Sequence, residues 1–167
     1  MNHHISRRLI ILMLALVVAA CGFHLRGAAD LAFSKLHIKG TASISKDLIS
    51  ALKSNGVTIV KEPDEAEELL ELMSDGQEKR ILSLGGTGSV REFELFYRIK
   101  FRLRDASSEL WGAEQMIEAR RDFSYLDTEL LAKSYEEAML YEDMRRDATR
   151  ELMRRLVAQK PKARAVK

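Results

Sequence analysis

Alternating apolar and polar residues dominate the middle of the chain. From Arg91 to Arg104 every second residue after the arginine is apolar, and the residues between them are charged apart from Phe96. A β-strand with one buried and one solvated face has this period of two. The segment from Trp111 to Tyr125 repeats the pattern. The sequence therefore predicts two neighbouring antiparallel strands.

Side-chain parity restricts how these two strands can pair. Both apolar sets must face the same side of the sheet, and a slip of one residue would reverse one strand. The connection between the strands must therefore hold an odd number of residues. Pairing Leu103 with Trp111 meets this condition and places Tyr97 opposite Ile117.

The first half of the domain is predicted to open as a β-α-β unit. The segment from Phe33 to Lys39 alternates like a strand. A helix follows, with Ser43 as its N-cap and the pair Asn55-Gly56 as its C-terminal stop. β-branched residues at 57–60 then begin a second strand.

That second strand is predicted to continue to Leu84. Residues 66–84 contain helix-forming residues, but Asp75-Gly76 would break a helix and apolar residues resume after it. We interpret the segment as a long strand with a bulge near Gly76. The loop from Gly85 to Ser89 then connects to the strand that begins at Arg91.

A long amphipathic helix is predicted from Ser134 to Ala158. Its apolar stripe consists of Leu140, Met144, Ala148, Leu152 and Leu156, while acidic residues lie early and arginines late, as the helix dipole favours. The order β-α-β-β-β-α indicates an α+β fold. We expect a two-layer sandwich, with two helices packed on one face of a four-stranded, mostly antiparallel sheet.

The N-terminus carries a targeting signal. Arg7 and Arg8 precede an apolar run, Leu9 to Ala20, which ends at Cys21, the only cysteine. We interpret residues 1–20 as a signal peptide, and the pattern V-A-A-C resembles a bacterial lipobox, in which the cysteine is lipidated. An uncleaved helical anchor and a buried free cysteine are the alternatives. Acyl chains on Cys21 would anchor the mature chain, and Gly22 after it resembles an outer-membrane sorting signal.

Removal of residues 1–20 changes the charge balance. It deletes two of the 27 basic residues, so the mature chain has 25 basic and 25 acidic residues. This balance argues against nucleic acid as a partner. One domain is expected at 21–158, followed by a short basic tail at 159–167 that we expect to be disordered.

The sequence offers no signature of an enzyme. After loss of the signal peptide, the histidines are His24 and His37, and no nucleophile, phosphate-loop or zinc motif is present. The acidic run at 62–68 is interpreted as a solvated turn rather than a catalytic carboxylate pair. We expect no catalytic residue, no metal site and no cofactor.

The polar side of the strand at 91–104 is basic. It carries Arg98, Lys100, Arg102 and Arg104. This face could bind an anionic partner. Alternatively, Glu114 and Glu118 on the next strand compensate its charge, and the expected pairing places Lys100 opposite Glu114.

A second group of cations is expected at one end of the sheet. The meander brings the connection before the last helix back to the end where Arg91 leaves the Gly-rich loop. Arg91, Lys133 and Arg121 can cluster there, among Val90, Phe123, Tyr125 and Leu126. Cations beside apolar groups suit a ligand that carries both phosphates and acyl chains. Ordinary loop polarity is the alternative.

Three segments resemble the LptE family of lipopolysaccharide-assembly lipoproteins of Gram-negative bacteria. They are "CGFHLRG" after the signal peptide, the strand "REFELFYRIKFRL", and "LLAKSYEEAMLYEDMRRDATRELMRRL" at the end. The resemblance extends to about Leu156. It implies an outer-membrane lipoprotein whose sandwich faces the periplasm, plugs an LptD-like β-barrel and helps deliver lipopolysaccharide to the cell surface.

The resemblance also implies that basic residues at the tip of the fold contact lipopolysaccharide. Lys133, in "LLAK", matches such a position. Arg91 matches approximately, because the loop "GGTGSVREF" places its arginine later than the family pattern. The alternative function is a free-standing outer-membrane lipoprotein that binds a small anionic envelope ligand, which would require a concave polar pocket.

Overall fold

Residues 31–125 and 130–159 are described by the structure, a computed structural model. Their elements in chain order are β1 (Lys35–Lys39), α2 (Ser45–Ser54), β2 (Thr58–Val60), the 3-10 turn η1 (Pro63–Glu65), β3 (Glu68–Leu84), β4 (Val90–Asp105), β5 (Gln115–Ser124) and α3 (Leu130–Val157). The predicted signal peptide, the lipidation site Cys21, and residues 160–167 of the predicted tail lie outside the described residues.

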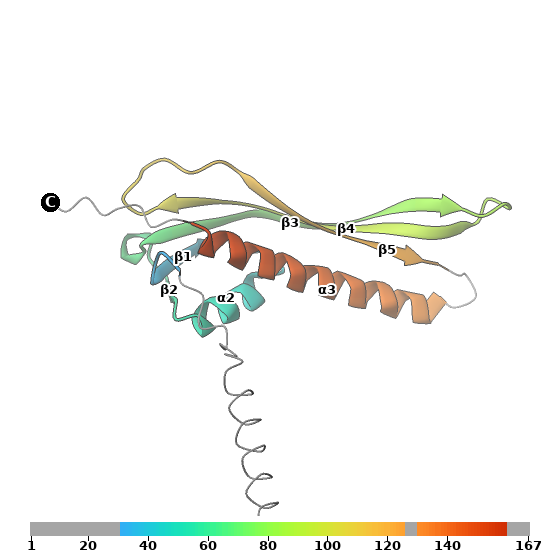
Figure 1. The fold of residues 1–167 in the computed structure, drawn as a ribbon, viewed down its shortest axis with the longest axis horizontal. Helices are drawn as coiled ribbons and strands as arrows, with labels where there is room; N and C mark the ends of the chain where they lie inside the picture. Colours follow the sequence, from blue (N-terminus) through green and yellow to red (C-terminus); the bar gives the residue numbers. More distant parts are fainter. Residues whose placement is uncertain (1–30, 126–129, 160–167) are drawn as a thin grey trace, which may run out of the picture.

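One mixed sheet and two helices form the two layers (Figure 1). The strand order is β2-β1-β3-β4-β5; β1 runs parallel to β2 and β3, while β3, β4 and β5 are antiparallel. Both helices cover the same face of the sheet, which confirms the α+β sandwich. The sheet has five strands rather than four, because η1, which begins at Pro63, divides the predicted second strand and β1 lies between its two parts.

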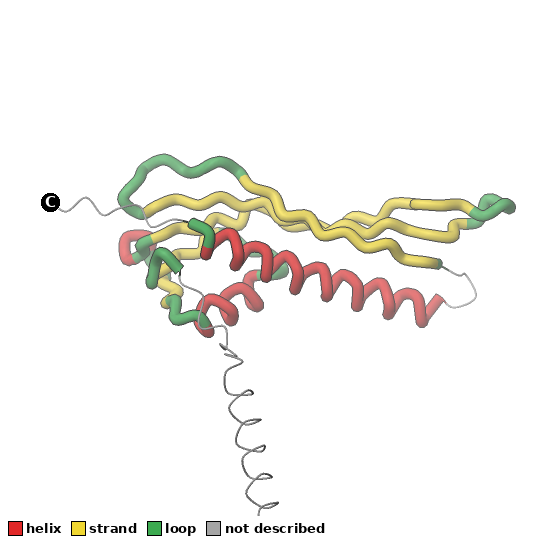
Figure 2. The backbone as a smooth tube through the Cα atoms, viewed as in Figure 1, coloured by secondary structure: helices red, strands yellow, loops and turns green. Residues whose placement is uncertain are grey.

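The β3–β4 hairpin is the longest part of the sheet (Figure 2). Its pairing runs from Glu68 opposite Asp105 to Leu84 opposite Val90. The predicted bulge is present, but it lies at Met73 rather than near Gly76. Between this bulge and a second register shift at Leu82, the odd-numbered residues of β3 face the helices, because one extra residue reverses the alternation. The Gly85–Ser89 segment forms the hairpin loop as predicted, closed by the Gly85 N–H donating to the Ser89 carbonyl at 2.7 Å.

The β4–β5 pairing differs from the prediction by two residues. Tyr97 lies opposite Ala119 rather than Ile117. The same faces remain buried, because a shift of two residues preserves parity. Trp111 lies outside β5 and off the core face; its ring packs against the guanidinium groups of Arg102 and Arg104 on the open face of the sheet.

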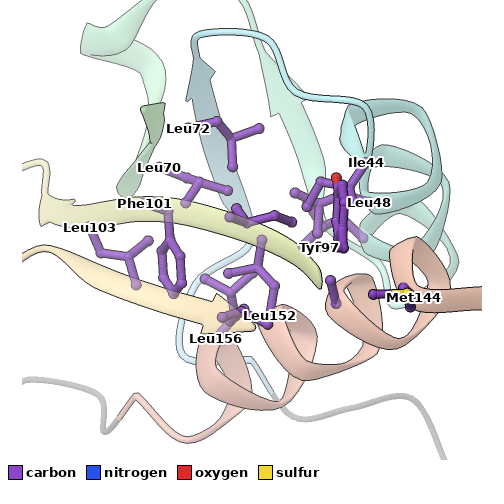
Figure 3. Packing of buried hydrophobic residues seen from close by; sticks show 14 of the residues in the cluster. Ile44, Leu48, Leu70, Leu72, Tyr97, Phe101, Leu103, Met144, Leu152 and Leu156 are labelled. Carbon is purple, nitrogen blue, oxygen red and sulfur yellow. The ribbon is translucent and has the colours of Figure 1, made fainter. Parts of the chain in front are cut away.

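The core lies between the helices and the inner face of the sheet (Figure 3). The apolar residues that the alternation assigned to the inner face of β4 are buried there, with Phe93 partly buried. The predicted stripe of α3 is also confirmed, because Met144, Ala148, Leu152 and Leu156 are buried and Leu140 is partly buried. These side chains pack against Leu48 and Leu52 of α2 in one cluster.

The N-terminus of α2 differs from the prediction. The N-cap is Ile44, and no side chain caps the helix. Ser43 instead binds Asp75 on β3, through its hydroxyl and through its backbone N–H at 2.8 Å. The buried Tyr97 donates its hydroxyl to the same carboxylate at 3.1 Å. This polar cluster joins the start of α2 to the hairpin.

Acid should weaken this cluster. Burial alone would raise the pKa of Asp75, but hydrogen bonds from Ser43 and Tyr97 outweigh it and hold the pKa below its ordinary value of 3.8. A lowered folded-state pKa contributes stability that is complete above the ordinary value and is lost as pH falls through the folded-state pKa. We therefore expect the free energy of unfolding to decline below about pH 4. Asp75→Asn should show a shallower decline in urea titrations between about pH 3 and pH 7; equal declines would contradict the assignment.

Candidate functional site

One end of the molecule brings together the hairpin, the end of β5 and the start of α3 (Figure 1). The hairpin extends beyond β5 at this end, whereas β1 and β2 lie at the opposite end. The backbone closes the arrangement, since the Tyr125 N–H donates to the Arg91 carbonyl at 2.8 Å. We call this end the tip.

Three aromatic rings form the base of the tip. Phe93 packs edge-on against Tyr125, with ring centroids 5.3 Å apart, and lies 6.4 Å from Phe123. The alternation of β4 and β5 places Phe93 and Phe123 directly opposite each other on the helix side. Edge-to-face and offset arrangements of this kind are favourable beyond the burial of area.

Lys133 lies over this aromatic base, as the sequence predicted. Its Nζ is 5.5 Å from the centroid of Phe123, and its side chain is only 12% exposed. Its ammonium pairs with Glu136 one turn further along α3, at 2.8 Å. A cation in such a place has an aromatic ring on one side and a positive charge that can attract an anionic group.

Lys79 is a second cation at the tip, and it was not among the predicted tip residues. Its Nζ lies 4.0 Å from the Phe93 centroid and within 5.7 Å of Phe123 and Tyr125, and it pairs with Glu137 at 2.6 Å. A bulge anywhere between Leu72 and Lys79 reverses the alternation before Lys79, so the predicted bulge near Gly76 was a sufficient signal once its effect on parity is followed. Lys79 then falls on the helix-facing parity of β3, opposite Leu95. We name Lys79, Lys133, Phe93, Phe123 and Tyr125 the lysine–aromatic cluster.

Arg91 lies just beyond this cluster. It is exposed at the start of β4, two residues before Phe93, and its Nε would lie 3.1 Å from a Cβ added at Gly85. The arginine thus packs against the glycine of the hairpin loop. The structure therefore places Arg91 at the tip, beside the cluster rather than within it.

Arg121 does not join the tip cations, contrary to the expectation. Its guanidinium pairs with Asp147 on α3. Asp147 lies fourteen residues after Lys133, about 21 Å along a helix that rises 1.5 Å per residue. Leu126, also expected at the tip, lies outside the described residues.

Two exposed apolar strips lie at this end of the molecule, and the first adjoins the cluster. One lies on the hairpin arm of β3, with Ile81, Leu82 and Leu84, of which Leu84 is 59% exposed. The other follows the side of α3 turned away from the cluster, with Leu131 (86% exposed), Tyr135 and Met139 at intervals of four residues, because positions two residues from Lys133 lie about 200° round the helix from it. Exposed large apolar side chains gathered in this way mark a surface that binds something apolar.

The open face of the sheet is charge-compensated. Arg98, Lys100, Arg102 and Arg104 all lie on it, but carboxylates from β3, from β5 and from the residue just before β5 pair with the first three. The partners are Glu78 and Glu118 for Arg98, Glu114 for Lys100 at 3.1 Å, and Glu71 for Arg102 at 2.5 Å. Hydrogen bonds from Arg80 and Arg98 also lower the pKa of Glu78. This face is an ion-paired surface rather than an anion site.

The described ranges contain neither a metal cluster nor a membrane-spanning helix. No group of three or more His, Cys, Asp or Glu side chains within 31–125 and 130–159 is placed to hold a metal ion. Neither of the helices in those ranges combines the length and the apolar run that crossing a membrane requires.

Comparison of the sequence with models of known protein families identifies the family of this chain. The model of the LptE family, described as lipopolysaccharide-assembly, matches residues 33–156. The chain belongs to the LptE family. The match covers every strand and nearly all of α3, so the resemblance seen in the sequence is confirmed.

Individual relatives agree with the LptE assignment. The LPS-assembly lipoprotein LptE of Photorhabdus laumondii is 29% identical over 175 residues, covering 98% of this chain and 93% of its own. The solution structure of an uncharacterized lipoprotein B from Nitrosomonas europaea is 37% identical with a TM-score of 0.71, covering 82% of this chain and 91% of that one. The crystal structure of rare lipoprotein B from Shewanella oneidensis is 28% identical with a TM-score of 0.67, covering 74% and 94%.

Proposed function

We propose that this LptE-family chain is an outer-membrane lipoprotein that works inside an LptD-like β-barrel and helps deliver lipopolysaccharide to the cell surface. Cys21 is its lipid anchor. The domain faces the periplasm and plugs the barrel, and its tip engages lipopolysaccharide through Lys133 and Arg91. The protein has no enzymatic activity in this role.

The lysine–aromatic cluster, with the exposed apolar strip of β3 beside it, carries the proposal. Lipopolysaccharide is an amphiphile, with phosphates beside acyl chains. The tip supports binding of such a ligand, because Lys133 and Arg91 supply charge for phosphates while Ile81, opposite Phe93, and Leu84 expose apolar surface nearby. Lys133 pairs with one carboxylate, that of Glu136, and an ammonium group has three N–H donors, so further donors remain for a phosphate.

The open face of the sheet supports a barrel as the partner. The lumen of a large outer-membrane barrel is polar and holds water. An ion-paired surface with both signs of charge suits such a lumen better than an apolar face would. The anchored N-terminus precedes β1, which lies at the end of the sheet opposite the tip, so a membrane anchor leaves the tip accessible.

Two experiments test the proposal. Affinity purification of a tagged full-length chain after mild detergent extraction should recover an outer-membrane β-barrel protein, and Cys21→Ser should remove the chain from the outer membrane. Depletion of the protein should make lipopolysaccharide accumulate in the inner membrane or periplasm. Recovery of no barrel, together with normal lipopolysaccharide at the surface on depletion, would reject the proposal.

A further inference from the structure

The strand β5 forms one edge of the sheet, and β2 forms the other edge. Strand β5 is ten residues long, and its pairing with β4 shows no register shift. A long, regular edge strand presents a row of backbone groups to which another strand can pair. Natural proteins protect such edges with bulges, proline or charged side chains. The edge strand β5 has no bulge and no proline, and its charged residues carry both signs, so an added strand that bears the complementary charges is not repelled.

The outward-facing backbone groups of β5 belong to its even-numbered residues. The Tyr125 N–H donates to Arg91, so odd-numbered residues face β4 in this antiparallel ladder. Consistent with this parity, the carbonyls of Met116 and Arg120 accept hydrogen bonds from arginine side chains, at 3.1 and 2.8 Å. The N–H groups of Glu118 and Asp122 therefore also point away from β4.

A basic groove runs between this edge and α3. Five arginines and three carboxylates line it. Two of the carboxylates are shared: Asp147 pairs with Arg121 and Arg150, and Glu151 with Arg154 and Arg155, the latter at 3.0 Å.

Sharing leaves positive charge uncompensated in the groove. Hydrogen bonds from Arg154 and Arg155 lower the pKa of Glu151, so this carboxylate remains charged near neutral pH. Each shared carboxylate still neutralises only one of its two guanidinium groups. Arg150 and Arg154 are also well exposed and retain N–H donors that a carboxylate could accept.

We propose that the β5–α3 groove binds an extended acidic segment of a partner protein, which adds to the sheet as a sixth strand beside β5. Backbone groups of the segment pair with the even-numbered residues of β5, and at Met116 and Arg120 they displace the arginine side chains that now donate to the carbonyls. The carboxylates of the segment lie against Arg150 and Arg154. An extended chain uses both features of the groove, the strand edge and the surplus of cations. A small anion or a lipid phosphate would use only the cations.

This surface is separate from the tip. Asp147 lies fourteen residues along α3 from Lys133, and the groove shares none of its lining residues with the lysine–aromatic cluster. The inference therefore stands or fails independently of lipopolysaccharide binding.

Fluorescence anisotropy with the full-length chain in detergent would test the proposal. The probe is a labelled peptide of about ten residues that alternates glutamate with valine, matching the length of β5 and the period of a strand. We expect saturable binding and slower hydrogen–deuterium exchange within 115–124. The variant Arg150→Gln/Arg154→Gln should bind roughly tenfold more weakly. Lys46→Gln/Lys53→Gln, which removes two exposed charges from α2, should bind as the parent does.

A second pair of variants separates strand addition from simple charge attraction. Glu118→Pro removes one outward N–H, whereas Glu118→Ala removes the same carboxylate and retains that N–H. Binding lost in the proline variant and retained in the alanine variant supports the added strand. Equal binding by both, or displacement of the peptide by inorganic phosphate at comparable concentration, would overturn the proposal in favour of a small-anion site. If Glu118→Pro does not fold, two other results can still overturn the proposal. One is peptide binding that the arginine replacements leave unchanged. The other is equally tight binding of a peptide in which lysine replaces glutamate.

Discussion

Gly40→Ala should lower the free energy of unfolding by about 3 kcal/mol, the largest stability loss we expect from adding a methyl group to any glycine within residues 31–125. Gly40 follows β1 with φ of +86°, a conformation that an L-residue adopts at a cost of about 1–2 kcal/mol. A Cβ at this position would also lie 2.2 Å from the carbonyl oxygen of Leu72. That oxygen belongs to the backbone of β3 beside the bulge, so the sheet itself would have to move.

Gly56→Ala is the matched control. Gly56 has nearly the same φ, +82°, but no atom lies within 4 Å of the added Cβ. The control should therefore lose only the conformational part, about 1 kcal/mol. Urea unfolding followed by circular dichroism measures both losses. Similar losses in the two variants would show that the contact with Leu72 is not the cause.

Lys133→Asp combined with Arg91→Asp should weaken lipopolysaccharide binding by roughly tenfold or more, because a charge-assisted hydrogen bond contributes about 1.5–3 kcal/mol. The reversal removes two cations from the tip and places carboxylates there instead. Of the single variants, Lys133→Asp should have the larger effect, because Lys133 is mostly buried over Phe123 whereas Arg91 is exposed.

Binding of lipopolysaccharide to the full-length chain in detergent, measured alongside circular dichroism of each variant, tests this assignment. Lys46→Asp with Lys53→Asp on α2 makes the same change in net charge away from the tip. The control should bind as the parent does. Unchanged binding by a folded Lys133→Asp/Arg91→Asp variant would remove both residues from the site.

The tip illustrates how far a sequence can locate a site. Lys133 and Arg91 were predicted at one end because a meander must return to the end it left, and that argument needs only the order of elements. The order of elements could not locate Lys79, because the face to which its side chain points depends on the β-bulge before it, which lies at Met73. Arg121 was misplaced, because the attraction of Asp147 on α3 draws its side chain into the groove instead.

The local hydrophobic pattern was sufficient to predict which side chains are buried, because burial depends on each residue's own polarity and position in its element. The period of two in β4 and the apolar stripe of α3 follow from which side chains leave water, so the amino-acid sequence by itself determines the α+β class and the buried face. Pairing between segments was different. The two-residue shift between β4 and β5 preserves every buried side chain, and therefore the hydrophobic pattern cannot distinguish the two registers. Only the tertiary structure decides it, because both registers bury the same faces; in the register that forms, Trp111 packs against Arg102 and Arg104 and the Gly112 N–H donates to the Leu103 carbonyl.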